Sequence, residues 1–220
     1  MVVLIPIETA SRELLYKLYL GMSLVQNGME CYVGSKAKIN YLINKFNSFI
    51  YFDKGYQKNK SDLIYQDIKK NGGIIVSLDE EGGVDYSDNK TLKIRYSPEL
   101  FQQVEKVFLW GRYQFKLLEN SITRNKNISI TGHPRFELLS TRFKKLYDRE
   151  VDLIKKAFGS FILINTNMGF GNNIRGDDWV KDVYSKWYPN ISDIMNYDKI
   201  KTSSFLKLIS KLAHNYDGKI

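Results

Sequence analysis

Short apolar runs alternate with longer segments of helical periodicity over the first 135 residues. The first run, Val2–Ile7, ends at polar Glu8, and apolar residues then recur at helical spacing up to the helix-terminating pair Asn27-Gly28. Further runs of strand length follow at residues 31–33, 49–52, 74–78, 107–110 and 128–130. Helical segments near 37–46, 63–70 and 113–118 separate several of these runs. The alternation predicts an α/β fold, a Rossmann-like doubly wound parallel sheet with right-handed crossovers.

The first helical segment places its apolar residues on one stripe, as in an amphipathic helix whose apolar side faces a core. The stripe consists of Leu14, Leu15, Leu18, Met22 and Val25. Ser11 precedes this segment and is of a residue type that caps helices, so we expect it to cap a helix that starts near Arg12.

The pattern divides the chain into three parts. Residues 1–135 correspond to one complete doubly wound domain, and residues 136–158 are charged and helical in period. A new apolar run at 161–165 predicts a further strand, with helical segments near 179–187 and 203–215 after it. Because the chain stops where the next strand is expected, residues 159–220 look like an incomplete second α/β domain.

Composition and charge narrow the class of protein. Hydrophobic residues make up 43% and charged residues 26%, which argues against disorder. One cysteine, Cys31, cannot form a disulfide within the chain, and with only two histidines a zinc site is not expected. The longest apolar run near the start is too short to span a bilayer, and no signal peptide precedes it. We therefore expect a cytoplasmic protein.

The net charge of +9 lies mostly after residue 110. A positive surface attracts nucleic acid, anionic membranes or phosphorylated small molecules, and charge alone does not choose among them. No basic cluster interleaved with aromatic residues is visible, so we expect no nucleic-acid partner. A peripheral contact with an anionic inner membrane remains open.

The strongest candidate for chemistry follows the fourth strand, where ligands of open parallel sheets bind. Asp79, Glu80 and Glu81 are three adjacent acids, followed by Gly82 and Gly83. Adjacent carboxylates repel, which raises at least one pKa and suits a general base or a nucleophile. The glycines would let the backbone approach a substrate. The alternative is an ordinary solvated acidic turn.

Polar residues also follow the first and sixth strands. Glu8 and Arg12 flank the first loop, where Arg12 could hold a carboxylate or phosphate; the alternative is a salt bridge between the two. His133 and Arg135 follow the sixth strand and offer a hydrogen-bonding group and a cation; the alternative is a structural interdomain turn. From the strand spacing we expect these residues and the acidic loop to converge on one crevice.

The end of the predicted seventh strand carries an uncharged polar pair, Asn165 and Asn167. Amide side chains suit sugar hydroxyls, and a helix-capping loop is the alternative. Neither GxGxxG nor GxxxxGK[ST] occurs, so dinucleotide-binding or phosphate-transfer Rossmann enzymes are not favoured. Nothing in the sequence requires a metal or another cofactor.

The order of five short motifs resembles that of bacterial surface carbohydrate biosynthesis proteins. The motifs are PIETASRE at 6–13, LDEEGG at 78–83, FLWG at 108–111, GHPRF at 132–136 and INTN at 164–167. Such proteins are similar to GT-B-type glycosyltransferases and are related in pattern to Kdo transferases, which use CMP-sugars, and more distantly to CDP-glycerol polymerases. The resemblance implies transfer of a sugar, such as a keto-deoxy acid from a CMP donor, onto a growing surface glycan (capsule or lipopolysaccharide).

The resemblance also implies roles for the three parts of the chain and for the acids. Residues 1–135 would be the acceptor-side domain, and 159–220 would open the nucleotide-sugar domain. The D/E-D/E-G motif of these transferases supplies the catalytic carboxylate, so Glu80 is the first choice, and Asp79 or Glu81 would tune or replace it. The partners would be a nucleotide-sugar donor and a glycan acceptor, positioned by Arg12, Arg135 and the asparagine pair.

One departure from the family pattern bears on activity. The nucleotide-binding motif is expected after residue 220, so His133-Pro134, in the turn that ends the first domain, does not take the nucleotide role. We therefore keep a second interpretation from another class, a noncatalytic, truncated glycan-binding or assembly module.

Overall fold

The computed structural model describes residues 1–83, 89–118, 127–166 and 168–217. The chain divides into two compact units, Met1–Lys144 and Lys145–Ile220. Each unit is described by itself below.

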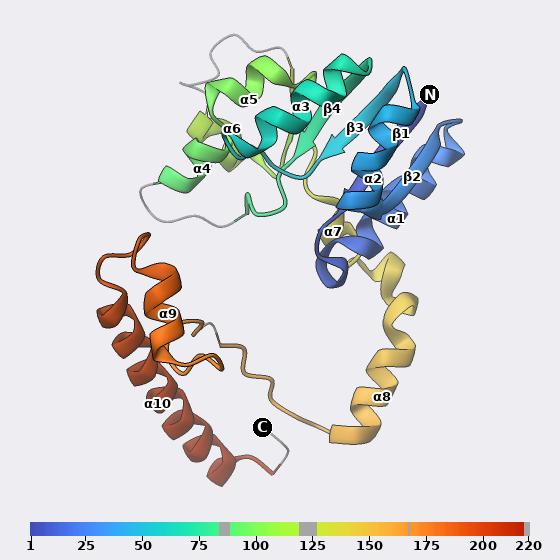
Figure 1. Cartoon of the computed structure of the whole chain (residues 1–220). Coiled ribbons are helices and arrows are strands. Elements are labelled where there is room, and N and C mark those ends of the chain that lie inside the picture. Colours follow the sequence, from blue (N-terminus) through green and yellow to red (C-terminus); the bar gives the residue numbers. More distant parts are fainter. Residues whose placement is uncertain (84–88, 119–126, 167, 218–220) are drawn as a thin grey trace. The chain divides into compact units, whose positions relative to one another are not determined.

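The first unit contains a six-stranded parallel sheet (Figure 1). Its strands are β1 (Val2–Ile7), β2 (Glu30–Ser35), β3 (Phe49–Asp53), β4 (Gly73–Leu78), β5 (Lys106–Leu109) and β6 (Ile128–Ile130). The strand order is β2-β1-β3-β4-β5-β6. The prediction of an α/β, Rossmann-like parallel sheet is confirmed, and each predicted apolar run of this unit forms a strand. Continuous apolar runs form the inner strands because both faces of a parallel sheet are buried by packing.

Helices connect the successive strands. They are α1 (Ala10–Gln26), α2 (Lys36–Leu42) with the 3₁₀ turn η1 (Ile43–Lys45), α3 (Lys60–Lys70), α4 (Lys90–Arg95), α5 (Pro98–Gln103), α6 (Arg112–Leu118) and, after β6, α7 (Pro134–Glu137). Local sequence sets several of their ends. A capping box between Asn59 and Asp62 starts α3, and Pro98 occupies the first turn of α5.

Side chains of the strands alternate between two cores. Leu4, Tyr51 and Val107 point to the face that carries residues of α2 to α6, whereas Ile5 and Phe52 point to the face of α1. The direction of the crossovers explains this division. Only the connection from β1 to β2 runs opposite to the others along the sheet, so right-handedness makes α1 the one crossover helix on its face among the described elements. Each fully buried residue of this kind contributes on the order of 1.5–3 kcal/mol.

The side of helix α1 that faces the sheet is not the side that carries the apolar stripe. Leu15 and Met22 of the stripe are 55% and 65% exposed, and the other three stripe residues are exposed as well. The buried residues are Glu13, Tyr16, Lys17 and Gly21. A Cβ at Gly21 would lie 3.1 Å from Val33 Cγ2, so the glycine allows close approach to β2. The expectation that the stripe faces the core is wrong because the polar residues of α1 take part in the site described below.

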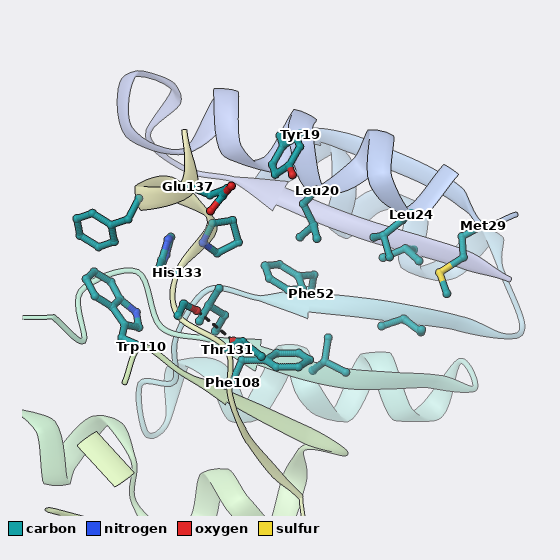
Figure 2. Close-up of a pocket in the computed structure, with 17 residues that line it drawn as sticks. Tyr19, Leu20, Leu24, Met29, Phe52, Phe108, Trp110, Thr131, His133 and Glu137 are labelled. Atoms are coloured by element: carbon teal, nitrogen blue, oxygen red, sulfur yellow. Dashed lines mark hydrogen bonds between the residues drawn. The ribbon is translucent and has the colours of Figure 1, made fainter. Parts of the chain in front are cut away.

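The α1 face of the sheet carries an apolar groove of about 760 Å³. Figure 2 shows Leu20 and Leu24 of α1 on one side of it, Phe52 and Phe108 of the sheet on another, and Trp110 near one end.

The second unit consists of helices within the ranges that the structure describes. They are α8 (Asp148–Phe158), preceded by the 3₁₀ segment η2 (Thr141–Tyr147) at the unit boundary, α9 (Asp177–Tyr184) and α10 (Ile191–Asn215). Val180, Ile191 and Met195 form its small core. The strand predicted at 161–165 is not formed: Phe161 makes a single β-bridge, residues 162–165 are irregular, and no described residue of the unit lies in a strand.

None of the helices in the described ranges combines the length and the apolar character that a membrane crossing requires.

Candidate functional site

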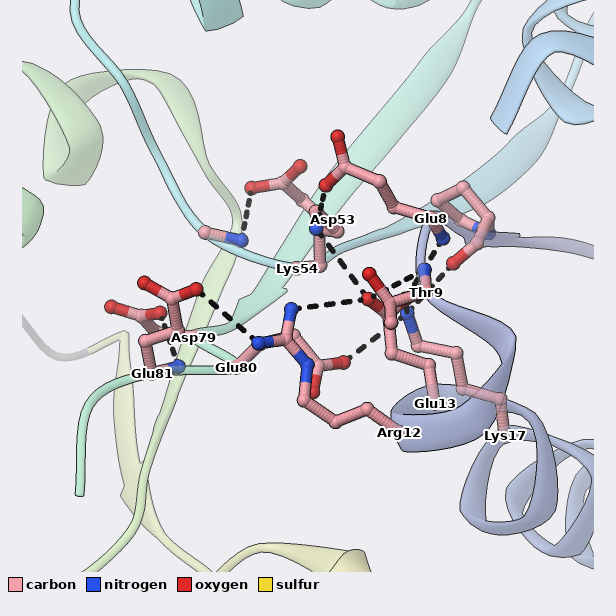
Figure 3. A network of polar contacts seen from close by, with 12 residues as sticks. Glu8, Thr9, Arg12, Glu13, Lys17, Asp53, Lys54, Asp79, Glu80 and Glu81 are labelled. Carbon is pink, nitrogen blue, oxygen red and sulfur yellow. Dashed lines mark hydrogen bonds and ion pairs between the residues drawn. The ribbon is translucent and has the colours of Figure 1, made fainter. Parts of the chain in front are cut away.

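Polar side chains gather at the carboxyl edge of the sheet, where β1, β3 and β4 end (Figure 3). The chain leaves β1 for β2 on one side and then crosses to β3 on the other, so the gap between β1 and β3 is the topological switch point at which open α/β sheets bind ligands. A cavity of about 700 Å³ lies there, which we call the switch-point cavity. It is lined by the end of β1, by the segment after β3 and by the acidic loop 79–81.

Glu80 is the centre of a buried cluster. Glu80 is 3% exposed. The Tyr16 hydroxyl donates to its Oε1, and Arg135 Nη2 donates to its Oε2. Lys17 Nζ lies 3.2 Å from Oε1, and His133 Nε2 lies 3.6 Å from Oε2. Residues from α1, the acidic loop and the turn after β6 thus meet at one carboxylate. The three segments meet as predicted from strand spacing, but His133 and Arg135 do not line the switch-point cavity, so one common crevice is not confirmed for the turn.

A second buried pair lies beside this cluster. Lys17 Nζ donates to Glu13 Oε2 at 2.8 Å and to the Pro6 carbonyl at 2.7 Å. Glu13 also accepts from the backbone N–H groups of Glu8, at 3.0 Å, and of Thr9, at 3.2 Å. Burial acts to raise the pKa of Glu13, but the hydrogen bonds from Lys17 and from the Glu8 backbone outweigh it and lower this pKa to about 2. Burial lowers the pKa of Lys17.

The other two acids of the loop share arginines. Arg95 contacts Asp79 Oδ1 at 3.1 Å and Glu81 Oε2 at 2.5 Å, and Arg12 Nη1 lies 3.3 Å from Glu81 Oε1. Burial raises the pKa of Asp79, with Glu81 adding a smaller like-charge effect, whereas the hydrogen bond from Arg95 is the main cause that lowers the pKa of Glu81. The Glu81 side chain is 51% exposed, so it is the acid of the three that reaches solvent.

The two glycines of the acidic loop are explained by packing. A Cβ at Gly83 would clash with the Trp110 ring, and one at Gly82 would lie 2.5 Å from Gln114 Nε2. Trp110 Nε1 donates to the Asp79 carbonyl at 2.6 Å, and Gln114 Nε2 donates to the Gly82 carbonyl. The approach of this backbone to a substrate stays a prediction, whereas its approach to β5 and α6 accounts for both glycines.

His133 is buried between aromatic rings. Its Nδ1 accepts a hydrogen bond from the Arg135 backbone N–H at 3.1 Å, so the proton of the neutral ring lies on Nε2, the nitrogen that faces Glu80. The rings of Tyr16 and Trp110 are centred 4.8 and 4.6 Å from it in edge-on contacts. His133 therefore caps α7 and fixes the turn that presents Arg135.

The first loop differs in two details from the sequence-based interpretation. Glu8 pairs with Lys54 instead of Arg12, so the salt bridge considered between Glu8 and Arg12 is not formed. Ser11 does not cap α1, because the helix begins at Ala10, two residues before the predicted start, and Thr9 takes the capping position; Ser11 is exposed. Glu8 and Arg12 line the switch-point cavity.

The role of the predicted asparagine pair at this site stays a prediction. Asn165 lies in the irregular segment of the second unit, and Asn167 lies outside the described residues.

Several residues of the site were missed by sequence reasoning. They are Glu13, Tyr16, Lys17, Asp53, Lys54 and Arg95. Two signals were available: Glu13 and Lys17 have the i, i+4 spacing of a helical ion pair, and Asp53 and Lys54 directly end the third apolar run. Asp53 accepts hydrogen bonds from the Tyr65 hydroxyl at 2.6 Å and the Gly55 N–H at 3.0 Å, and burial raises its pKa.

The fold and the site define an α/β protein with a Rossmann-like parallel sheet and a charged cavity at its carboxyl edge. Comparison of the chain with protein-family models, with curated proteins and with solved structures found no match in any of the three.

Proposed function

We propose that this chain takes part in transfer of a sugar from a nucleotide-sugar, such as a CMP-linked sugar, to a growing glycan of the bacterial surface, and that it uses a carboxylate of the acidic loop. The observation that carries the proposal is the meeting of this loop with α1 and the 132–135 turn around Glu80, beside a cavity at the switch point. These are the segments on which the resemblance to GT-B-type transferases rests.

The geometry favours different roles for the acids than their order in the motif suggested. A general base must come within hydrogen-bond reach of the hydroxyl that it deprotonates. Both acids line the cavity and have protein donors on both carboxylate oxygens, but Glu80 is buried, whereas the Glu81 side chain is 51% exposed. We assign Glu81 as the carboxylate that touches the acceptor. Glu80 is then a positioning residue that holds Arg135 and α1 in place.

Release of CMP from a CMP-linked keto-deoxy sugar, in the presence of a bacterial glycan extract, tests the reaction. Loss of a general base typically lowers the rate by about 10²- to 10⁴-fold, so Glu81→Gln should do so while leaving the thermal melting temperature close to that of the wild type. Glu105→Gln is a matched control, because Glu105 is exposed just before β5 and does not line the cavity. Full activity of Glu81→Gln with loss in Glu80→Gln would move the role back to Glu80. Activity in both variants would refute carboxylate catalysis by this loop.

One observation favours a noncatalytic glycan-binding or assembly module as a second candidate. Each acid of the loop is already paired with a cation of the same chain: Asp79 with Arg95, Glu80 with Arg135, and Glu81 with both Arg12 and Arg95. Such pairing also suits a rigid binding surface. Glycan binding that survives in Glu81→Gln, with no CMP release by the wild type, would support this candidate over the transferase.

A further inference from the structure

The switch-point cavity has two walls of different character. The acidic loop and its arginines form one wall, and the segments after β2 and β3 form the other. The second wall carries the four lysines that we call the lysine rim: Lys36, Lys54, Lys58 and Lys60. None of these lysines belongs to the motifs that suggested a sugar transferase.

Partners within the chain neutralise only half of the lysine rim. Lys54 pairs with Glu8, and Lys58 pairs with Glu99 at 2.5 Å. In the part of the chain that the structure describes, Lys36 and Lys60 form no ion pair. Ammonium groups that line a cavity and have no ion-pair partner attract an anion.

A buried carboxylate lies beside the lysine rim. Asp53 is 7% exposed and lines the same cavity, and it receives hydrogen bonds from Tyr65 and Gly55. Burial raises its pKa, and the charge of Lys36 is the smallest of the causes that act to lower it. Donors other than the lysine ammonium groups thus satisfy this carboxylate.

Side chains, and not the backbone of α3, have to supply the anion contacts. The first N–H groups of α3 already have acceptors: Lys60 and Ser61 donate to the Gln57 carbonyl at 3.1 and 2.8 Å, and Asn59 donates to Asp62 Oδ2 at 2.7 Å. Uncharged groups for the remainder of a ligand are present beside the rim. Asn40, whose Oδ1 accepts from the Tyr51 hydroxyl at 2.9 Å, lines the same cavity.

We infer that the switch-point cavity binds a phosphate-bearing ligand whose phosphate contacts Lys36 and Lys60. Lysine ammonium groups bind phosphate as point charges, and the site lies where parallel sheets of this topology bind phosphorylated ligands. The inference concerns binding and does not depend on sugar transfer. The phosphate belongs to a nucleotide or to a sugar phosphate, and the test separates these two sources.

Calorimetric titration of the full chain with glucose 1-phosphate, CMP, inorganic phosphate and glucose tests the inference. We expect saturable binding of glucose 1-phosphate or CMP that weakens as salt is added, and weaker or no binding of glucose. The double variant Lys36→Gln/Lys60→Gln should weaken binding about tenfold or more, because each lysine loses a charge-assisted hydrogen bond.

The double variant Lys38→Gln/Lys70→Gln is the matched control, because both of its lysines are exposed on α2 and α3 and do not line the cavity. It carries the same change in net charge and should bind like the wild type. Binding of glucose 1-phosphate but not CMP identifies a sugar phosphate as the source, and the reverse identifies a nucleotide. The inference is overturned if no phosphate compound binds, if glucose binds as tightly, or if both double variants bind equally well. None of these results depends on CMP release, so transfer can fail while phosphate binding holds.

Discussion

Lys17→Met tests whether the buried charges of the site stabilise the first unit. The lysine is fully buried, and its ammonium group contacts Glu13 at 2.8 Å, the Pro6 carbonyl at 2.7 Å and Glu80 at 3.2 Å. Methionine keeps an unbranched apolar stem of similar size, so the change removes the charge and leaves little cavity. The two carboxylates and the carbonyl then lose a common donor.

The expected loss of unfolding free energy depends on the hydrogen-bond donors that each carboxylate keeps in the variant. Removing one partner of a buried ion pair costs about 3–5 kcal/mol. Glu13 keeps two backbone N–H donors, and Glu80 keeps Tyr16 and Arg135, so we expect the lower end of this range, about 3 kcal/mol. Because a domain of this size is stable by about 5–15 kcal/mol, the loss is easily measured.

The assay is urea denaturation followed by circular dichroism at pH 7 and at about pH 4. Acid protonates unpaired buried carboxylates and relieves their cost, so the difference between Lys17→Met and the wild type should shrink at the lower pH. Lys38→Met, an exposed lysine on α2, is the control and should lie within about 0.5 kcal/mol of the wild type. If Lys17→Met were as stable as this control at pH 7, the buried ion pairs would not contribute as argued.

Three further predictions concern stability. The pKa of Glu13 is about 2 in the fold against an ordinary 4.5, so ionised Glu13 stabilises the folded state above pH 4.5. This stabilisation, about 3 kcal/mol, is lost as the pH falls toward 2. Glu13→Gln should therefore flatten this part of the curve of unfolding free energy against pH. Leu18→Gln, on the exposed stripe of α1, should change stability by less than about 0.5 kcal/mol in urea denaturation, and a loss above 2 would show that the stripe is covered in solution. Gly83→Ala should cost about 1–3 kcal/mol because the added methyl meets Trp110, and an unchanged melting temperature would contradict that packing.

The sheet could be predicted because its signal is local. Buried parallel strands are continuous apolar runs, and the runs at 49–52 and 74–78 became β3 and β4 with nearly the predicted bounds. The acidic loop and the turn with His133 could be placed at one edge for a related reason, since the carboxyl ends of parallel strands share an edge. The run at 161–165 has the same local signal but, in the described part of the chain, forms a single bridge at Phe161 and no strand, because a strand also needs an extended neighbour, which a local pattern does not report.

The cations of the site could not be predicted in the same way. Lysine and arginine total 33, and nothing local distinguishes Lys17 or Arg95, which contact the acids, from Lys38, which is exposed. Their role depends on which helix face meets the loop, and that is decided by tertiary packing. The same holds for Glu80, whose burial follows from neighbours on α1 and after β6 that are far away in sequence.

The orientation of α1 and the charge of the site have one cause. Glu13, Tyr16 and Lys17 have to face the carboxyl edge to reach Glu80 and the first loop, and Gly21 brings the same side of the helix against β2. A helix can present one side only, so the stripe that includes Leu18 is left exposed. An exposed apolar stripe next to a strand end thus indicates here that the opposite, polar side of the helix is engaged in a site.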